Sequence, residues 1–135
     1  MEVYRVDDNK RQKILVIEDE PFICLVCKKT LATEGYEVDI AENGLTALEM
    51  LSKKRYDLIF SDVRTPKMNG IEFYRQIKKQ DQGLAERIIF TSGDTMSPDV
   101  KDFQSKNQNP FLAKPFIPGE LREIVKKTLN KTNEP

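Results

Sequence analysis

Five short runs of strand character alternate with segments of helical periodicity, and this alternation constrains the fold more than any other feature of the sequence. Four runs are continuously apolar: Lys13–Ile17, Leu58–Phe60, Ile88–Phe90 and Phe111–Ala113. The fifth run, residues 36–40, alternates apolar residues with Glu37 and Asp39, which predicts a strand with one wetter face at the edge of a sheet. After each run, apolar residues recur every three or four positions, which is typical of one face of a helix. Strands that alternate with helices form a parallel sheet through right-handed crossovers. The sequence therefore predicts an α/β fold with (βα)₅ order.

Turn and cap residues indicate where several of these helices begin and end. Pro21 and Pro118 are placed to open a helix, because proline fits the first turn. Asn43 and Ser97 are of the types that cap a helix N-terminus. Gly35 suits the position just after a helix.

The length of 135 residues supports one domain rather than two. Residues 1–12 and 130–135 are polar and aperiodic, and they are predicted to be tails. The folded domain is expected to span residues 13–129.

Composition excludes several classes of function. The 22 basic residues balance the 22 acidic residues, so no basic field indicates direct nucleic-acid binding. No apolar run approaches the ~20 residues that span a bilayer, and no secretory leader is visible, so we expect a cytoplasmic protein without membrane insertion. The absence of histidine excludes histidine-based acid–base catalysis and a phosphohistidine on this chain.

The two cysteines, Cys24 and Cys27, form a C-x-x-C pattern inside the first predicted helix. A structural zinc ion needs about four ligands, and the chain has no other cysteine or histidine. We therefore expect both to act as small apolar residues.

Carboxylates follow two of the predicted strands. Glu18 and Asp19 come directly after the first strand, and Asp62 comes just after the third. Ligands of open parallel sheets bind at the carboxyl ends of the strands, so these three side chains are expected to share one small site. Their repulsion favours a bound divalent cation, and oxygen ligands favour Mg²⁺, or Mn²⁺, over Zn²⁺.

Two further polar groups end the fourth and fifth strands at the same edge. Thr91 supplies a hydroxyl group and Lys114 a positive charge. Carboxylates, a metal ion, a lysine and a hydroxyl together are typical of a site that handles phosphoryl groups. An aspartate in such a site can be the nucleophile that becomes an aspartyl phosphate.

Taken together, the segments that end these strands resemble the receiver domain of two-component response regulators. They are residues 14–20 (ILVIEDE), 57–70 (DLIFSDVRTPKMNG), 88–94 (IIFTSGD) and 111–116 (FLAKPF). The resemblance implies a flavodoxin-like, doubly wound, three-layer fold with an open five-stranded sheet in the order 2-1-3-4-5. Residues 93–98 are similar to receivers found in hybrid sensor histidine kinases.

The resemblance also implies the roles of the acidic residues. Asp62 would be the phosphoacceptor. Asp19 would bind Mg²⁺ directly, and Glu18 would act through a coordinated water. The backbone carbonyl of Arg64 would face the metal as well. Glu18 stands where aspartate is commoner in the family.

Four residues of the fourth and fifth strand ends receive roles in the same way. Thr91 and Lys114 would stabilise the phosphoryl group after transfer. Thr91 and Phe111 would act as the switch, although Phe111 lacks the hydroxyl of the tyrosine that is common there. The bond before Pro115 would be cis.

The implied function is that of a signalling receiver rather than an independent enzyme. It would take a phosphoryl group from the phosphohistidine of a sensor histidine kinase or a phosphotransfer domain, catalysing its own phosphorylation. The face made by the helix near Pro98, the strand at 111–113 and the last helix would then bind an output partner. The sequence does not identify this partner. A homodimer that forms on phosphorylation is a further expectation.

Two alternatives use similar folds. A haloacid-dehalogenase-type phosphatase also uses an aspartate after a strand, but it needs a second aspartate where this chain has Arg64. A flavodoxin holds phosphate in a hydroxyl-rich loop after its first strand, whereas this loop begins with Glu18 and Asp19, which repel phosphate.

Overall fold

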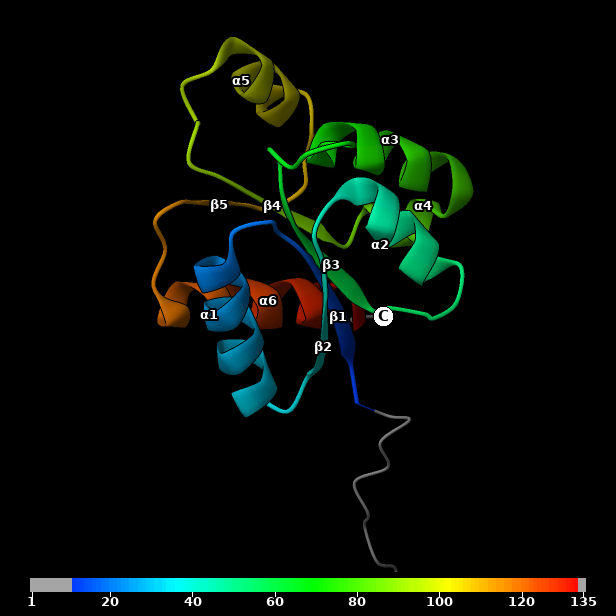
Figure 1. Cartoon of the computed structure of the whole chain (residues 1–135), viewed down its shortest axis with the longest axis vertical. Helices are drawn as coiled ribbons and strands as arrows, with labels where there is room; N and C mark the ends of the chain where they lie inside the picture. The colour runs from blue at the N-terminus through cyan, green and yellow to red at the C-terminus, as the bar shows by residue number, and fades with distance from the viewer. Residues whose placement is uncertain (1–10, 134–135) are drawn as a thin grey trace, which may run out of the picture.

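The fold is built on one five-stranded parallel sheet, which the computed structural model describes together with its helices over residues 11–133 (Figure 1). The strand order is β2-β1-β3-β4-β5, as predicted, and all four strand pairs are parallel. In chain order the elements are β1 (Lys13–Ile17), α1 (Pro21–Thr33), β2 (Glu37–Ala41), α2 (Gly44–Leu51), β3 (Leu58–Asp62), α3 (Gly70–Gln80), α4 (Gln82–Ala85), β4 (Ile88–Ser92), α5 (Pro98–Ser105), β5 (Phe111–Ala113) and α6 (Pro118–Asn133).

The register of the strands places their carboxyl ends level with one another. Ile17 of β1 lies opposite Ser61 of β3, and Asp62 of β3 lies opposite Thr91 of β4. Thr91 in turn pairs with Leu112 of β5. The loops that leave β1, β3, β4 and β5 therefore start at one edge of the sheet.

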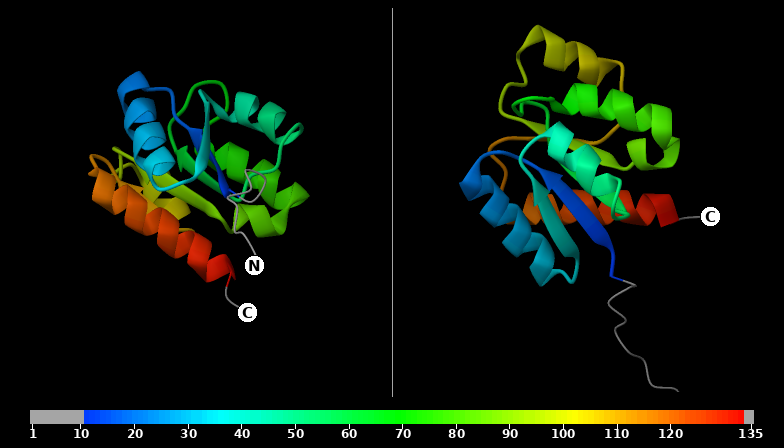
Figure 2. Two further views of the ribbon diagram at one scale, coloured as in Figure 1. Left: turned by 90° about the horizontal axis from the view of Figure 1, so that it is seen from below. Right: turned by 45° about the vertical axis from the view of Figure 1, so that its right-hand side comes forward.

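Two apolar layers hold the sheet between helices. Helices α1 and α6 cover one face, and α2 to α5 cover the other (Figure 2). The largest fully buried side chains come mainly from the strands, including Phe60 of β3 and Phe90 of β4. Burial on both faces explains the continuous apolar runs of β1, β3 and β4, whereas edge strand β2 is only partly buried and carries Glu37 and Asp39. No helix among residues 11–133 has the length and apolar character needed to cross a membrane.

The predicted helix boundaries are right at several ends. Asn43 caps α2 by accepting a hydrogen bond from Thr46 N at 2.9 Å. Gly35, just after α1, has a φ of 93°, which glycine adopts without strain. Ser97 precedes α5, but its side chain makes no capping hydrogen bond within the described part of the chain.

Several boundaries differ from the sequence predictions. Strand β2 lies one residue later than 36–40, at Glu37–Ala41. Strands β3 and β4 include the polar residues at their ends, Asp62 and Ser92, because these residues still pair in the ladder. The four-residue helix α4, capped by Asp81, was not predicted. The expected tail at 130–135 is wrong in part, because α6 continues to Asn133. Residues 1–10 of the other expected tail lie outside the described residues.

Candidate functional site at the carboxyl edge

The structure brings the three predicted carboxylates together. Glu18, Asp19 and Asp62 each offer an oxygen, and these oxygens lie within 4.8 Å of one another. Glu18 and Asp62 are 1% and 5% exposed, whereas Asp19 is exposed. One open side of the cluster faces solvent, so it can admit a ligand.

Lys114 neutralises part of this negative charge. Its Nζ donates a hydrogen bond to Asp62 Oδ2 at 2.7 Å and lies 2.9 Å from Glu18 Oε1. The contact with Glu18 is an ion pair without hydrogen-bond alignment, so Glu18 Oε1 is a buried oxygen with no hydrogen-bond partner in the described structure. One lysine leaves the three carboxylates with excess negative charge, and this donor set fits a hard divalent cation.

Burial sets the electrostatics of the cluster. Desolvation raises the pKa of Glu18 and the charge of Asp62 adds to that rise, while contacts with Lys114 and the backbone N–H of Glu20 oppose it. For Lys114, burial alone would lower the pKa, but the contacts of its ammonium with the Asp62 and Glu18 carboxylates outweigh that effect and raise the pKa. The lysine is therefore held in its charged form.

Gly70 packs closely against the backbone of Asp62 and Val63, a contact that the sequence did not predict. A Cβ added at Gly70 would lie 2.7 Å from the backbone oxygen of Asp62 and 3.0 Å from Val63 Cα. Gly70 N also donates to Val63 O at 2.9 Å. A side chain at Gly70 would push the loop after β3 out of place. The Asn69–Gly70 pair signalled only a helix start in the sequence.

Arg64 relates to the site in two ways. Its backbone N–H donates to Asp62 Oδ1 at 3.0 Å, which fixes the orientation of that carboxylate. Its side chain instead reaches the loop after β4, where the guanidinium bonds to Asp94, Ser97 and Asp99. No pattern in the sequence linked these three residues to Arg64, because they follow a different strand.

The predicted switch residues lie on β4 and β5. Thr91 Oγ1 donates to Leu112 O at 2.6 Å, so this hydroxyl is bonded to β5 rather than to Asp62. The Phe111 ring is half-buried and lies 5.9 Å from the Phe90 ring, centroid to centroid. The Lys114–Pro115 peptide bond is cis, as the resemblance implied.

The C-x-x-C pair has the buried surroundings expected of small apolar residues. Cys27 is fully buried and Cys24 half-buried, and neither forms a disulfide. Burial raises the pKa of Cys27 to about 12, so this thiol is not reactive at neutral pH.

The fold and this site together define a receiver domain, and comparison with known proteins agrees. The family model for the response regulator receiver domain matches residues 14–126. The chain is 32% identical over 118 residues to sporulation initiation phosphotransferase F of Bacillus subtilis (strain 168), covering 87% of this chain and 94% of the relative. It spans about half the length of several other curated relatives. The chain belongs to the response regulator receiver domain family of two-component systems.

Solved structures show the same fold. The receiver domain of a sensor histidine kinase from Pseudomonas aeruginosa PAO1, with a magnesium ion in its active-site cleft, is 30% identical with a TM-score of 0.78; the match covers 89% of this chain and 98% of that one. The response regulator TrrA of Thermotoga maritima, in complex with Mg²⁺ and beryllofluoride, is 36% identical with a TM-score of 0.74, covering 87% and 98%. The phosphatase alternative finds no support in these matches.

Proposed function

We propose that Asp62 accepts a phosphoryl group from the phosphohistidine of a sensor histidine kinase or a phosphotransfer protein. The observation that carries this assignment is the setting of Asp62, whose two oxygens are held by the Lys114 ammonium and the Arg64 backbone N–H at the mouth of the acidic cluster. A carboxylate oxygen of Asp62 attacks the phosphorus, the P–N bond to the donor histidine breaks, and the imidazole leaves with its electron pair.

Glu18, Asp19 and Asp62, with the backbone carbonyl of Arg64, would hold Mg²⁺, and Mn²⁺ would use the same oxygen ligands. The buried Glu18 Oε1 supports this assignment, because it accepts no hydrogen bond in the described structure and its charge is met only by the Lys114 ammonium that it shares with Asp62. When bound, the ion supplies positive charge that brings phosphoryl oxygens close to these carboxylates. Lys114 would pair with the transferred phosphoryl group from its position between Asp62 and Glu18.

The donor would dock on exposed apolar side chains around the site. Four large hydrophobic residues that follow β1, β4 and β5 are 63–75% exposed: Phe22, Leu25, Met96 and Ile117. Because these segments begin at the carboxyl edge, their side chains can surround a histidine that is presented to Asp62. Exposed apolar groups around a polar site are typical of a protein interaction surface. The free cysteines fit a reducing cytoplasm, where such donors act.

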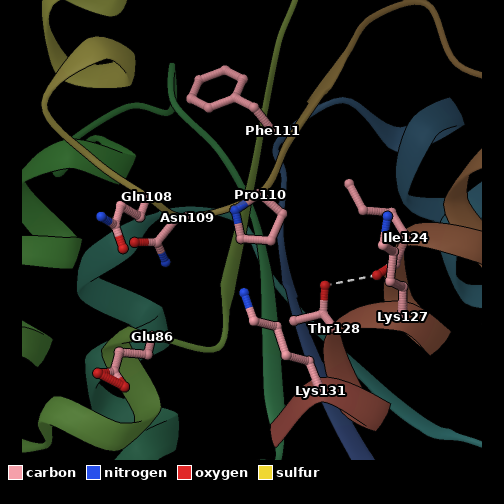
Figure 3. A pocket seen from close by; sticks show the side chains of 9 residues that line it. All are labelled: Glu86, Gln108, Asn109, Pro110, Phe111, Ile124, Lys127, Thr128 and Lys131. Carbon is pink, nitrogen blue, oxygen red and sulfur yellow. Dashed lines mark hydrogen bonds between the residues drawn. The ribbon is translucent and has the colours of Figure 1, made fainter.

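The output face would be formed by α5, β5 and α6. Thr91 would leave Leu112 O and donate to the phosphoryl group, and Phe111 would move into the space beside it. A cavity of about 630 Å³ lies against β5 and α6, with Phe111 at one end and Glu86 and Lys131 at the other (Figure 3). A partner seated there would sense the position of Phe111 directly. A homodimer formed through this face after phosphorylation belongs to the same proposal.

The proposal is tested by labelling with acetyl phosphate and Mg²⁺, followed by intact mass and peptide mapping. The parent gains one phosphoryl group, and Asp62→Asn gains none, because the amide has no nucleophilic oxygen of comparable strength. Asp57→Asn is the control, because Asp57 lies just before β3, at the end of the strand opposite Asp62, where it accepts a hydrogen bond from Lys13 N at 2.7 Å. Labelling of another residue in the Asp62 variant, or equal labelling with chelator present, would overturn the assignment.

A further inference from the structure

Arg64 bridges the loop after β3 and the start of α5. Its guanidinium nitrogen Nη2 lies 2.9 Å from Asp99 Oδ1, 2.8 Å from Ser97 Oγ and 3.3 Å from Asp94 Oδ2. Ser97 is the residue before α5 and Asp99 belongs to its first turn. The Arg64 side chain, which comes from the loop after β3, therefore contacts the N-terminal end of α5 and the loop that leads into it from β4.

Helix α5 has few other attachments at this end. Of its eight residues only Val100 is buried, and Phe103 is half-buried against the Phe90 and Tyr74 rings. The Ser97 hydroxyl contacts Asp99 and Arg64 and does not cap the helix. Arg64 does not replace the missing cap, because a guanidinium only donates hydrogen bonds; instead it ties the side chains of Ser97 and Asp99 to the loop after β3.

A phosphoryl group on Asp62 would compete for the same guanidinium. Arg64 N already contacts Asp62 Oδ1 at 3.0 Å, so the two side chains start from adjoining positions. The phosphoryl group adds between one and two negative charges and strong acceptor oxygens, which arginine binds with paired N–H groups. The existing pairs are exposed, at 46% for Arg64, 54% for Asp94 and 57% for Asp99, so they are easily exchanged.

We propose that Arg64 is a phosphorylation-sensitive clasp: it holds the first turn of α5 in the resting domain and releases that turn when the phosphoryl group on Asp62 draws the guanidinium away. Arg64 is a positioning residue in this scheme, because it acts on α5 through Ser97 and Asp99. The release half rests on the proposed function, whereas the resting contact does not. Movement of the Arg64 guanidinium from the start of α5 to the phosphoryl group would thus link the phosphorylation site to the output face independently of Thr91.

Amide hydrogen exchange of residues 101–106 in the resting domain tests the clasp. Lys101 N donates to Ser97 O at 2.9 Å, so its exchange reports opening of the first turn. Arg64→Gln should raise exchange in this segment about twofold or more, the scale expected for exposed charge pairs. Arg64→Lys should restore part of the protection. Arg122→Gln, on α6, is the matched control and should match the parent.

A double-variant comparison isolates the contact. Asp99→Asn should raise exchange as Arg64→Gln does, and the combined variant should exceed neither single variant, because both break the same bridge. Additive increases, or parent-like exchange in Arg64→Gln, would overturn the clasp.

Beryllofluoride with Mg²⁺ tests the release. It should raise exchange at 101–106 in the parent and produce a smaller rise in Arg64→Gln, where the turn is already free. Equal increments in the two proteins would refute release by Arg64. A parent that neither binds beryllofluoride nor takes up phosphate at Asp62 would refute the proposed function instead, and the resting measurements would still decide whether Arg64 holds α5.

Discussion

Two lysines of this domain each bridge two carboxylates, yet the two sets differ in burial and in what they can do. The buried cluster consists of Lys114, Glu18 and Asp62, and the surface cluster consists of Lys54, Glu37 and Asp39. The side chain of Lys114 is 15% exposed and that of Lys54 is 36% exposed. The side chains of the acidic residues differ more strongly: they are 2–7% exposed in the buried cluster and 31–33% exposed in the surface cluster.

The pKa values of Glu18 and Asp39 shift in opposite directions, although each carboxylate contacts a lysine, because the two differ in burial. In the surface cluster, burial pushes the pKa of Asp39 upward, but hydrogen bonds from Tyr56 and Lys54 outweigh it and lower the pKa. In the buried cluster, desolvation dominates and raises the pKa of Glu18. Both clusters have two carboxylates for one lysine. In the surface cluster, solvent and the Tyr56 hydroxyl offset the excess charge, and the cluster ties edge strand β2 to the segment before β3. The buried cluster is shielded from solvent and has a third carboxylate, Asp19, beside it, which suits it to bind a cation.

The largest expected difference is between the two lysine-to-methionine variants. Lys114→Met leaves buried carboxylates without their cation and should lower the free energy of unfolding by about 3–5 kcal/mol. Lys54→Met removes an exposed partner and should cost less than about 1 kcal/mol. Urea denaturation at pH 7 without divalent ions measures both. Equal losses would show that the clusters do not differ in the way that their burial indicates.

Magnesium should sharpen this contrast. Because the proposed Mg²⁺ site uses the carboxylates that Lys114 neutralises, millimolar Mg²⁺ should raise the stability of Lys114→Met more than that of the parent. A concentration of several times the dissociation constant adds about 1 kcal/mol. Lys54→Met should respond as the parent does. Added chelator should cancel every gain, and NaCl at matched ionic strength should not reproduce it. An equal response of all three proteins would place the ion outside the buried cluster.

Much of the buried cluster could be predicted from the sequence, because topology alone brings its members together. Glu18, Asp62 and Lys114 each follow an apolar run, and parallel strands place such positions at one edge. The direction in which the Lys114 side chain points, and the burial of Glu18, required the structure.

The contacts that the sequence did not predict depend on side-chain direction between segments far apart in the chain. Glu37 and Asp39 fitted the wetter face of an edge strand, but nothing in their spacing identified Lys54 as their partner. Ser97 had the residue type of a cap, and the structure shows its hydroxyl bonded to Arg64 instead. In both cases a local preference gave way to a tertiary contact.

The smallest expected effect is the pH dependence of the surface cluster. The pKa of Asp39 is lower in the folded chain than its ordinary value of 3.8, so this group stabilises the fold above that value and loses its contribution as pH falls through the lowered folded pKa. Asp39→Asn lacks the contribution at every pH. The parent should therefore be more stable than the variant by about 0.5 kcal/mol at pH 7, and the difference should shrink as the pH falls below 3.8.

Urea midpoints of parent and variant across this range measure that difference, with Glu49→Gln as the control. Glu49 is 71% exposed and lies 3.7 Å from Lys53, so its removal should change the midpoint little at any pH. A gap between parent and Asp39→Asn that stays constant or widens in acid would contradict a charge-based role for Asp39. Closure of the gap would show that Asp39 holds β2 through its negative charge, because an asparagine can keep the hydrogen bond from Tyr56 but not the ion pair with Lys54. The surface cluster would then stabilise the edge of the sheet through charge, whereas metal binding and phosphoryl transfer would be confined to the buried cluster.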